Sequence, residues 1–197
     1  AGLDILLSRH AGREEVIFGT TVAARRVPAL ERTLGMFVDV LPLLVQVRGT
    51  VRQLIQQIRQ VAVGAYTHQI PFGSIVEHSG IKQENFCHPL FQLGFTLHNY
   101  PDQPVAAGNL ILERVPLPER TTHCDIEFHM AAQSGRIGGH IHYRAGLFFP
   151  EQLADWPREL QDIYQQMVLD VDCRVEEIKI SNGPASAATP AESNSSL

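Results

Sequence analysis

Residues 36–68, MFVDVLPLLVQVRGTVRQLIQQIRQVAVGAYTH, change from a strand-like pattern to a helix-like pattern within a single stretch. The first part, Met36–Val47, is a long apolar run with several β-branched residues, which predicts a buried strand. The second part, Thr50–His68, repeats apolar side chains at the i, i+3, i+4, i+7 spacing of an amphipathic helix. Thr50 can cap this helix, and Gln53 stands three residues later, as a capping box requires.

Further strands are predicted on both sides of this stretch. Glu15–Val22 is typical of a buried strand, and Phe91–His98 alternates apolar with polar residues as a half-buried strand does. Asn109–Val115 predicts another strand after the turn-rich segment Tyr100–Gly108. We therefore expect an α/β fold in which a mixed β-sheet is flanked by amphipathic helices.

A hairpin is predicted from His123–Ala132 and Arg136–Arg144, joined by a tight turn at Ser134-Gly135. A two-residue turn sets the register of three pairs: Ile126 with Tyr143, Phe128 with Ile141, and Met130 with Gly139. The opposite face then carries Asp125, Glu127, His129, His140 and His142. Such a face could bind zinc, because histidines two apart on one strand converge. Solvated histidines are commoner on a hairpin, so the sequence favours a solvated face and no metal.

The two ends of the chain differ in composition. Gly2–Arg9 resembles the last turns of a helix, so we expect that something precedes residue 1. A last helix is expected to open at Pro150 and to be kinked at Pro157. Residues 181–197 are rich in Ala, Ser and Pro and have little to bury, which predicts a folded domain over 1–180 and a flexible tail over 181–197.

The overall composition is that of a globular protein. Of the 197 residues, 44% are apolar and 19% are charged, and the formal net charge is −5. The absence of a basic stripe argues against nucleic-acid binding, and the apolar runs are too short and too interrupted for a membrane span. The cysteines, Cys87, Cys124 and Cys173, are odd in number and lack metal-ligand spacing, so we expect inert reduced thiols in a cytoplasmic protein.

Four segments resemble, in order, motifs of the condensation domains of nonribosomal peptide synthetases. The family patterns are VVxGTPVAGR, IGxFVNTLPL, HQDVPFE and SPLFQVMF. The matching segments here are Val16–Arg26 (VIFGTTVAARR), Leu34–Leu43 (LGMFVDVLPL), His68–Phe72 (HQIPF) and His88–Phe95 (HPLFQLGF). Asp125 also stands at the family's FDL-type strand, and Gly138–Phe148 is similar to its GxxxYxxxLF run.

The resemblance implies one lobe of a two-lobed acyltransferase. Such domains pair two lobes, each similar to a chloramphenicol acetyltransferase subunit, around a tunnel. Donor and acceptor arrive there as thioesters on the phosphopantetheine arms of carrier proteins, and a peptide bond forms. The family's catalytic signature HHxxxDG lies in the N-terminal lobe. This chain has no adjacent pair of histidines. The resemblance therefore implies a C-terminal lobe that is inactive alone, binds no cofactor itself, and works with an N-terminal lobe and with donor and acceptor carrier proteins.

The resemblance also implies a set of tunnel or lobe-interface residues and no catalytic residue in this chain. That set is Arg25, Phe37, Asp39, His68, Gln69, Pro71, Phe72 and Asp125. Structural roles compete at several of them. His68 could simply end a helix, where the helix dipole favours a basic side chain. Pro71 and Phe72 could shape a helix entry and a core contact. Asp39 could pair with Arg25 or Arg26, since a carboxylate in an apolar strand needs a partner.

The sequence departs from the family patterns at three places. Asp39 stands where the family has Asn, one residue is missing between Gln69 and Ile70, and Gln83–Cys87 (QENFC) replaces an RDxSR segment. Alternative functions are therefore a lobe of an epimerisation, heterocyclisation or CoA-dependent acyltransferase domain. A further alternative, from a different class, is a non-catalytic docking or interaction module.

Overall fold

The computed structural model describes residues 1–25, 27–81, 89–98, 105–113, 115, 121–133 and 135–180. The predicted tail over 181–197 and the departing segment Gln83–Cys87 lie outside these ranges. Within them, no helix combines the length and the apolar character that crossing a bilayer requires. The chain divides into two compact units. Unit 1 consists of Ala1–Val16, Val45–Arg59 and the described residues from Phe149 onward, and unit 2 of Ile17–Leu44 and Gln60–Phe148.

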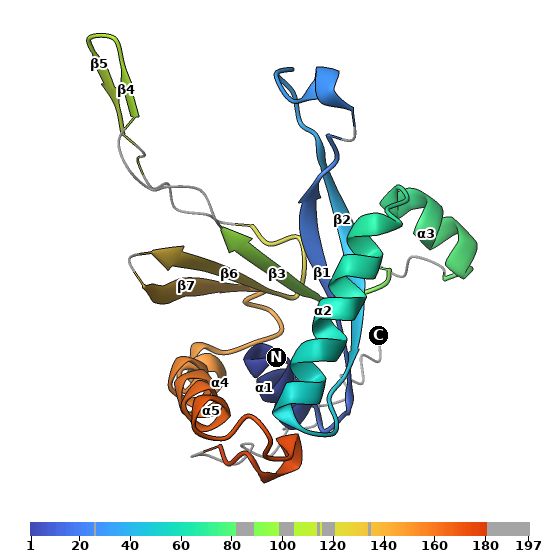
Figure 1. Ribbon diagram of the computed structural model, residues 1–197, viewed down its shortest axis with the longest axis vertical. Helices are drawn as coiled ribbons and strands as arrows, with labels where there is room; N and C mark the ends of the chain where they lie inside the picture. Colours follow the sequence, from blue (N-terminus) through green and yellow to red (C-terminus); the bar gives the residue numbers. More distant parts are fainter. Residues whose placement is uncertain are drawn as a thin grey trace, which may run out of the picture. The chain divides into compact units, whose positions relative to one another are not determined.

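A five-stranded mixed sheet dominates unit 2 (Figure 1). Its strands, in spatial order, are β2 (Val38–Gln46), β1 (Glu15–Ala23), β3 (Leu93–His98), β6 (Ile126–Gln133) and β7 (Arg136–Tyr143). β3 lies parallel to both β1 and β6, whereas β7 is antiparallel to β6. The predicted mixed sheet is therefore confirmed.

The predicted register of the β6–β7 hairpin is confirmed at all three pairs: Ile126 with Tyr143, Phe128 with Ile141, and Met130 with Gly139. Gly135 supplies the positive φ of 74° that the tight turn requires. Ile126 and Phe128 are buried, as the alternation predicts. The alternation fails at Leu97, which is exposed near the end of β3.

Two helices follow the β2 strand. α2 (Val51–Thr67) begins with the predicted capping box: the Gln53 N–H donates to Thr50 Oγ1 at 3.3 Å, and the Thr50 N–H donates to Gln53 Oε1 at 3.0 Å. α3 (Phe72–Ser79) begins directly after Pro71, whose fixed φ suits a helix entry.

The segment between β3 and β6 differs from the prediction. β4 (Val105–Ala107) and β5 (Leu110–Leu112) form a separate two-stranded antiparallel hairpin outside the main sheet (Figure 1). Gly108, with φ 62°, opens its two-residue turn. The strand predicted at Asn109–Val115 is thus shorter, and part of the segment predicted as turns is a strand. Period alone could not reveal β4, because a three-residue strand is too short to show one.

Unit 1 contains three helices and the first turns of α2. α1 (Gly2–Ala11) packs against α5 (Trp156–Leu169), and the short α4 (Pro150–Leu153) precedes α5. The prediction of one kinked helix is wrong: Pro157 stands in the first turn of α5, where a missing N–H costs no hydrogen bond. The core of this unit includes Ile5, Leu6, Leu7, Val45, Val51, Leu54, Leu153, Trp156, Ile163, Met167, Val175 and Ile178.

The last short elements are two 3-10 turns, Pro28–Leu30 in unit 2 and Val175–Glu177 in unit 1. On α5, Ile163 and Met167 are buried, whereas Tyr164 is exposed. Tyr164 instead lies against α1, where a Cβ on Gly2 would meet its ring at 2.4 Å.

Candidate functional site

Asp39 joins the start of β2 to the start of α3. Its Oδ1 accepts the N–H of Val40 at 2.9 Å and the N–H of Phe72 at 3.3 Å. Phe72 is the first residue of α3, so the carboxylate satisfies a helix N–H that has no partner within the helix. The positive end of the helix dipole favours a negative charge there. The Phe72 ring packs edge-on against Phe91, with centroids 5.9 Å apart.

The predicted salt bridge from Arg25 to Asp39 is not formed. The Arg25 guanidinium lies over the Phe37 ring, 4.5 Å from its centroid. It donates to three loop carbonyls, those of Leu30, Thr33 and Gly35. These carbonyls lie close to Arg25 along the chain. The Asp39 carboxylate accepts backbone N–H groups instead, so each side chain has polar partners without a salt bridge. The other predicted partner, Arg26, lies outside the described residues.

The residues between α2 and α3 are partly exposed. His68 directly follows α2, is exposed, and has its Nδ1 3.0 Å from the carbonyl oxygen of Gly64. This contact is the one expected of a histidine that ends a helix. Gln69 is half-buried, and Pro71 is exposed at the N-cap of α3. The HQIPF segment therefore connects the end of α2 to the Asp39–Phe72 contact.

Asp125 lies apart from this group. Its carboxylate pairs with Arg144 at 3.1 Å, which links the start of β6 to the end of β7. In the sheet order, β1 and β3 separate β6 from β2, the strand of Asp39. Of the predicted site residues, the structure thus brings together Asp39 with Pro71 and Phe72, and Arg25 with Phe37. Asp125 joins neither pair.

The sequence favoured a solvated histidine face on the hairpin. In the structure this face is partly buried. Glu127 is 9% exposed, and His129 and His142 are half-buried, whereas His140 is exposed. A carboxylate oxygen of Glu127 and one ring nitrogen each of His129 and His142 lie within 4.8 Å of one another. The hairpin pattern revealed which residues share the face. It did not reveal their burial, because that depends on the neighbouring β3.

Cys124 lies beside this face. Burial, reinforced by the charges of Glu127 and Asp125, raises the pKa of its thiol to about 12, although Arg144 acts in the opposite direction. The thiol is therefore held in its protonated, unreactive form, as the sequence predicts. The pKa of Cys173 is also raised, first by burial and then by Asp170. Cys87 lies outside the described residues.

Unit 1 contains a partly buried pair that the sequence reasoning missed. His10 Nε2 on α1 lies 2.6 Å from Glu159 Oε2 on α5, and Glu159 is 2% exposed. The His10 ring also packs on Trp156, with centroids 4.9 Å apart. A signal was available: Glu159 lies three residues after Trp156 and four before Ile163, inside the apolar stripe of the helix.

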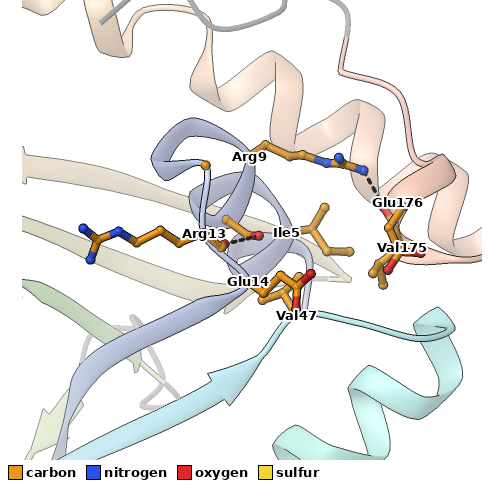
Figure 2. Close-up of a pocket in the computed structure, with 9 residues that line it drawn as sticks. Ile5, Arg9, Arg13, Glu14, Val47, Val175 and Glu176 are labelled. Carbon is orange, nitrogen blue, oxygen red and sulfur yellow. Dashed lines mark hydrogen bonds between the residues drawn. The ribbon is translucent and has the colours of Figure 1, made fainter.

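Unit 1 also has a shallow pocket between α1, the end of β2 and the 3-10 turn at Val175–Glu177. Its volume is about 250 Å³. Figure 2 shows the Arg9 guanidinium donating to the Val175 carbonyl, at 2.9 Å, across this pocket. The lining includes two arginines, Arg9 and Arg13, and two glutamates, Glu14 and Glu176, so it carries no excess of either charge.

Solved structures define the class of this fold. The chain superposes on the X-domain from teicoplanin biosynthesis with a TM-score of 0.80 and 22% identity, over 91% of this chain and 42% of that one. It superposes on a four-domain nonribosomal peptide synthetase bound to AMP and glycine with a TM-score of 0.81 and 23% identity, over 92% of this chain and 15% of that one. The fold is that of a chloramphenicol acetyltransferase-like lobe.

Sequence comparison identifies the family. The family model of the condensation domain matches residues 1–186, so the chain belongs to the condensation domain family of nonribosomal peptide synthetases. It is 31% identical to cyclosporin synthetase of Tolypocladium inflatum over 182 residues, which are 89% of this chain. It is 33% identical to PF 1022-synthetase of a Rosellinia species over 155 residues, or 75% of this chain. The chain spans only 1% and 5% of the lengths of these two relatives.

Proposed function

We propose that this chain is the C-terminal lobe of a condensation domain and forms one wall of the tunnel in which carrier-bound donor and acceptor are joined. One observation carries this proposal: the condensation family model matches residues 1–186, yet the sequence has no HHxxxDG signature. Family membership supports the acyltransferase chemistry. The missing signature supports the assignment of the catalytic histidines to another lobe.

The proposed reaction joins two tethered substrates. The acceptor amine attacks the thioester carbonyl of the donor, a C–N bond forms, the C–S bond breaks, and the released thiol takes up the proton that the amine loses. Holding both reactants in place supplies a large part of the rate. The partner lobe would supply the hydrogen-bonding or general-base histidine. The phosphopantetheine arms belong to the donor and acceptor carrier proteins.

In this proposal the residues of unit 2 shape and stiffen the tunnel wall. Asp39 holds the start of α3 beside β2, and Arg25 holds the loop between β1 and β2 through its carbonyls and through Phe37. Pro71 and Phe72 fix the entry into α3. Their role is positional, because none of them combines a base with a group that orients it.

Exposed apolar side chains in unit 2 support the proposal that a partner lobe binds this chain. Leu34 is 99% exposed and Met36 is 91% exposed in the loop before β2. The β4–β5 hairpin exposes Leu110, Ile111 and Leu112. Each of these two segments exposes large apolar groups, as surfaces that another protein covers often do. An N-terminal lobe that carries HHxxxDG is the partner that fits the family.

Reconstitution tests this proposal. The chain alone, given a loaded donor and a loaded acceptor carrier protein, should form no dipeptide above background. Adding a matching N-terminal lobe should produce a complex on size-exclusion chromatography and should restore dipeptide formation. The matched control is the same lobe with its signature histidines replaced, which should still bind but not restore turnover. Robust turnover by this chain alone would overturn the assignment.

A non-catalytic interaction module is the second candidate. A neighbour of the same fold, the X-domain of teicoplanin biosynthesis, is described in a complex with OxyB. If this chain is such a module, it should remain a monodisperse monomer that ignores an N-terminal lobe. The reconstitution experiment separates the two functions. The predicted cytoplasmic location belongs to the same proposal and would be checked by cell fractionation.

A further inference from the structure

Three side chains with metal-binding atoms meet on one face of the β6–β7 hairpin. Glu127 and His129 stand two residues apart on β6, so they point to the same face of the sheet. His142 on β7 pairs directly with Glu127 in the register, which places it on that face as well. One ligand atom from each of the three lies within 4.8 Å of the other two.

The Glu127 carboxylate is held in place by the backbone. Its Oε1 accepts the N–H of His123 at 2.7 Å and the N–H of Cys124 at 2.9 Å. Gly94 pairs with Glu127 across the β3–β6 ladder, and a Cβ on Gly94 would come within 3.0 Å of Glu127 Cγ. The glycine therefore leaves room for the stem of the Glu127 side chain. Because Oε1 is engaged, Oε2 is the oxygen turned toward the histidines, 3.3 Å from His129 Nε2.

The His129 ring is oriented from its other side. Its Nδ1 lies 3.4 Å from His98 Nε2, and the two rings stack with centroids 5.6 Å apart. When Nδ1 donates to His98, Nε2 presents a lone pair on the side that faces Glu127, as a metal ligand requires. The centroid of the His142 ring lies 5.0 Å from that of His129. Two of the three ligand groups, Glu127 and His129, thus have outer partners that orient them.

We propose that Glu127, His129 and His142 bind a divalent transition-metal ion of the zinc class. Two imidazole nitrogens and one carboxylate oxygen suit zinc, whereas magnesium and calcium prefer sites made of oxygen alone. At metal–ligand distances of about 2.0–2.2 Å, neighbouring ligands of a tetrahedral ion lie roughly 3.3 Å apart. The Glu127–His129 separation of 3.3 Å already meets this requirement. The ligand nitrogen of His142 lies within 4.8 Å of the other two ligand atoms and would move toward them on binding.

The bound ion would cross-link β6 to β7 and leave one coordination position for a water molecule or a fourth ligand. A ligand that binds only the folded state raises the stability of the fold with its concentration. The site does not depend on the proposed condensation function, because its ligands lie on β6 and β7 and not at the Asp39–Phe72 contact.

Metal titration of the complete 197-residue chain tests the proposal. After chelator treatment and removal of the chelator, Co²⁺ is added and its visible absorption is followed, and Zn²⁺ is then added as a competitor. We expect one equivalent of Co²⁺ to bind, to be displaced by Zn²⁺, and to resist competition by excess Mg²⁺. Thermal unfolding should shift to higher temperature as Zn²⁺ is added.

Substitutions identify the ligands. His129→Ala should weaken Zn²⁺ binding by at least about tenfold. Losing an outer partner of a metal site already costs about tenfold or more in affinity, and losing a ligand should cost no less. Glu127→Gln should do the same while keeping an oxygen for the N–H groups of His123 and Cys124, so this variant decides the question if His129→Ala does not fold. His78→Ala, which removes a histidine on α3, is the matched control and should bind Zn²⁺ as the parent chain does.

Three results would overturn the proposal. The first is the lack of a stoichiometric equivalent of Co²⁺ or Zn²⁺ on a parent chain with native circular dichroism. The second is equal binding by the parent chain and the folded Glu127→Gln or His129→Ala variant. The third is a loss of binding in His78→Ala. In each case the cluster would be a hydrogen-bonded polar group that stabilises the hairpin without a metal.

Discussion

Asp39 Oδ1 lies 3.3 Å from the backbone nitrogen of Phe72, 33 residues later in the chain, and accepts its N–H. A strand residue thereby caps the N-terminus of α3. The loss of such a cap costs about 1 kcal/mol of folding free energy. We therefore expect Asp39→Ala to lower the free energy of unfolding by about that amount, as measured by urea denaturation.

The matched variant at this position is Asp39→Asn. The Asn side chain keeps an acceptor oxygen for the Phe72 N–H and has the residue type of the family motif, so it should retain most of the stability. In the reconstituted two-lobe domain, a fall in rate with Asp39→Ala beyond the loss of folded protein would show that the carboxylate also acts in the tunnel. An Asp39→Asn variant as unstable as Asp39→Ala would contradict the capping role.

Gly19 on β1 leaves room for the ring of Phe91. A Cβ at this position would lie 2.1 Å from the ring, and Phe91 is among the most deeply buried side chains. Gly19→Ala should therefore overpack the sheet and lower the free energy of unfolding by about 1–3 kcal/mol in chemical denaturation. Gly64→Ala is the control: on α2, with open space around it, it should be neutral or stabilise the helix by up to about 1 kcal/mol. Equal effects at both positions would refute the packing argument.

The pair of His10 and Glu159 should make unit 1 sensitive to single substitutions. His10→Ala leaves a carboxylate that is 2% exposed without its partner, which should cost roughly 3 kcal/mol. Replacing both residues by apolar ones, as His10→Leu with Glu159→Met, should recover most of that loss because no buried charge remains. Differential scanning calorimetry of the three proteins measures the comparison. A double variant less stable than His10→Ala would show that the pair is net stabilising.

Cys124 should resist alkylation in the folded protein. Burial and the nearby charges of Glu127 and Asp125 raise the pKa of its thiol to about 12, so at pH 8 the thiolate is scarce. Iodoacetamide followed by peptide mass spectrometry should find Cys124 unmodified under native conditions and modified in guanidinium. Rapid native labelling would mean that the thiol is neither buried nor protonated.

The same thiol implies a pH dependence of stability. Its folded pKa, about 12, is above the unfolded value of about 8.5, so between these values the folded state holds a proton that the unfolded state has lost. Stability should therefore fall as the pH rises above about 8.5. Cys124→Ala should show a smaller fall over that range in denaturation midpoints. An unchanged slope would assign the alkaline loss to other groups.

Several features of the fold could be predicted from sequence because they are local. The Thr50 capping box, the α2 helix and the β6–β7 register depend on residues that are close along the chain, where backbone geometry alone fixes which side chains meet. The family motifs are likewise short, contiguous segments, so the condensation family could be predicted from the sequence. Patterning failed at Pro157, where one apolar stripe spans two helices.

The partners of the polar side chains were decided by tertiary structure. Asp39 binds the backbone of α3 and not an arginine, and Glu127 is buried because β3 lies beside β6 with glycine at position 94. His10 meets Glu159 across 149 residues of sequence. The physical reason is common to all three. A buried polar group takes whichever donor or acceptor packing brings within about 3 Å, and packing between distant segments has no period along the chain.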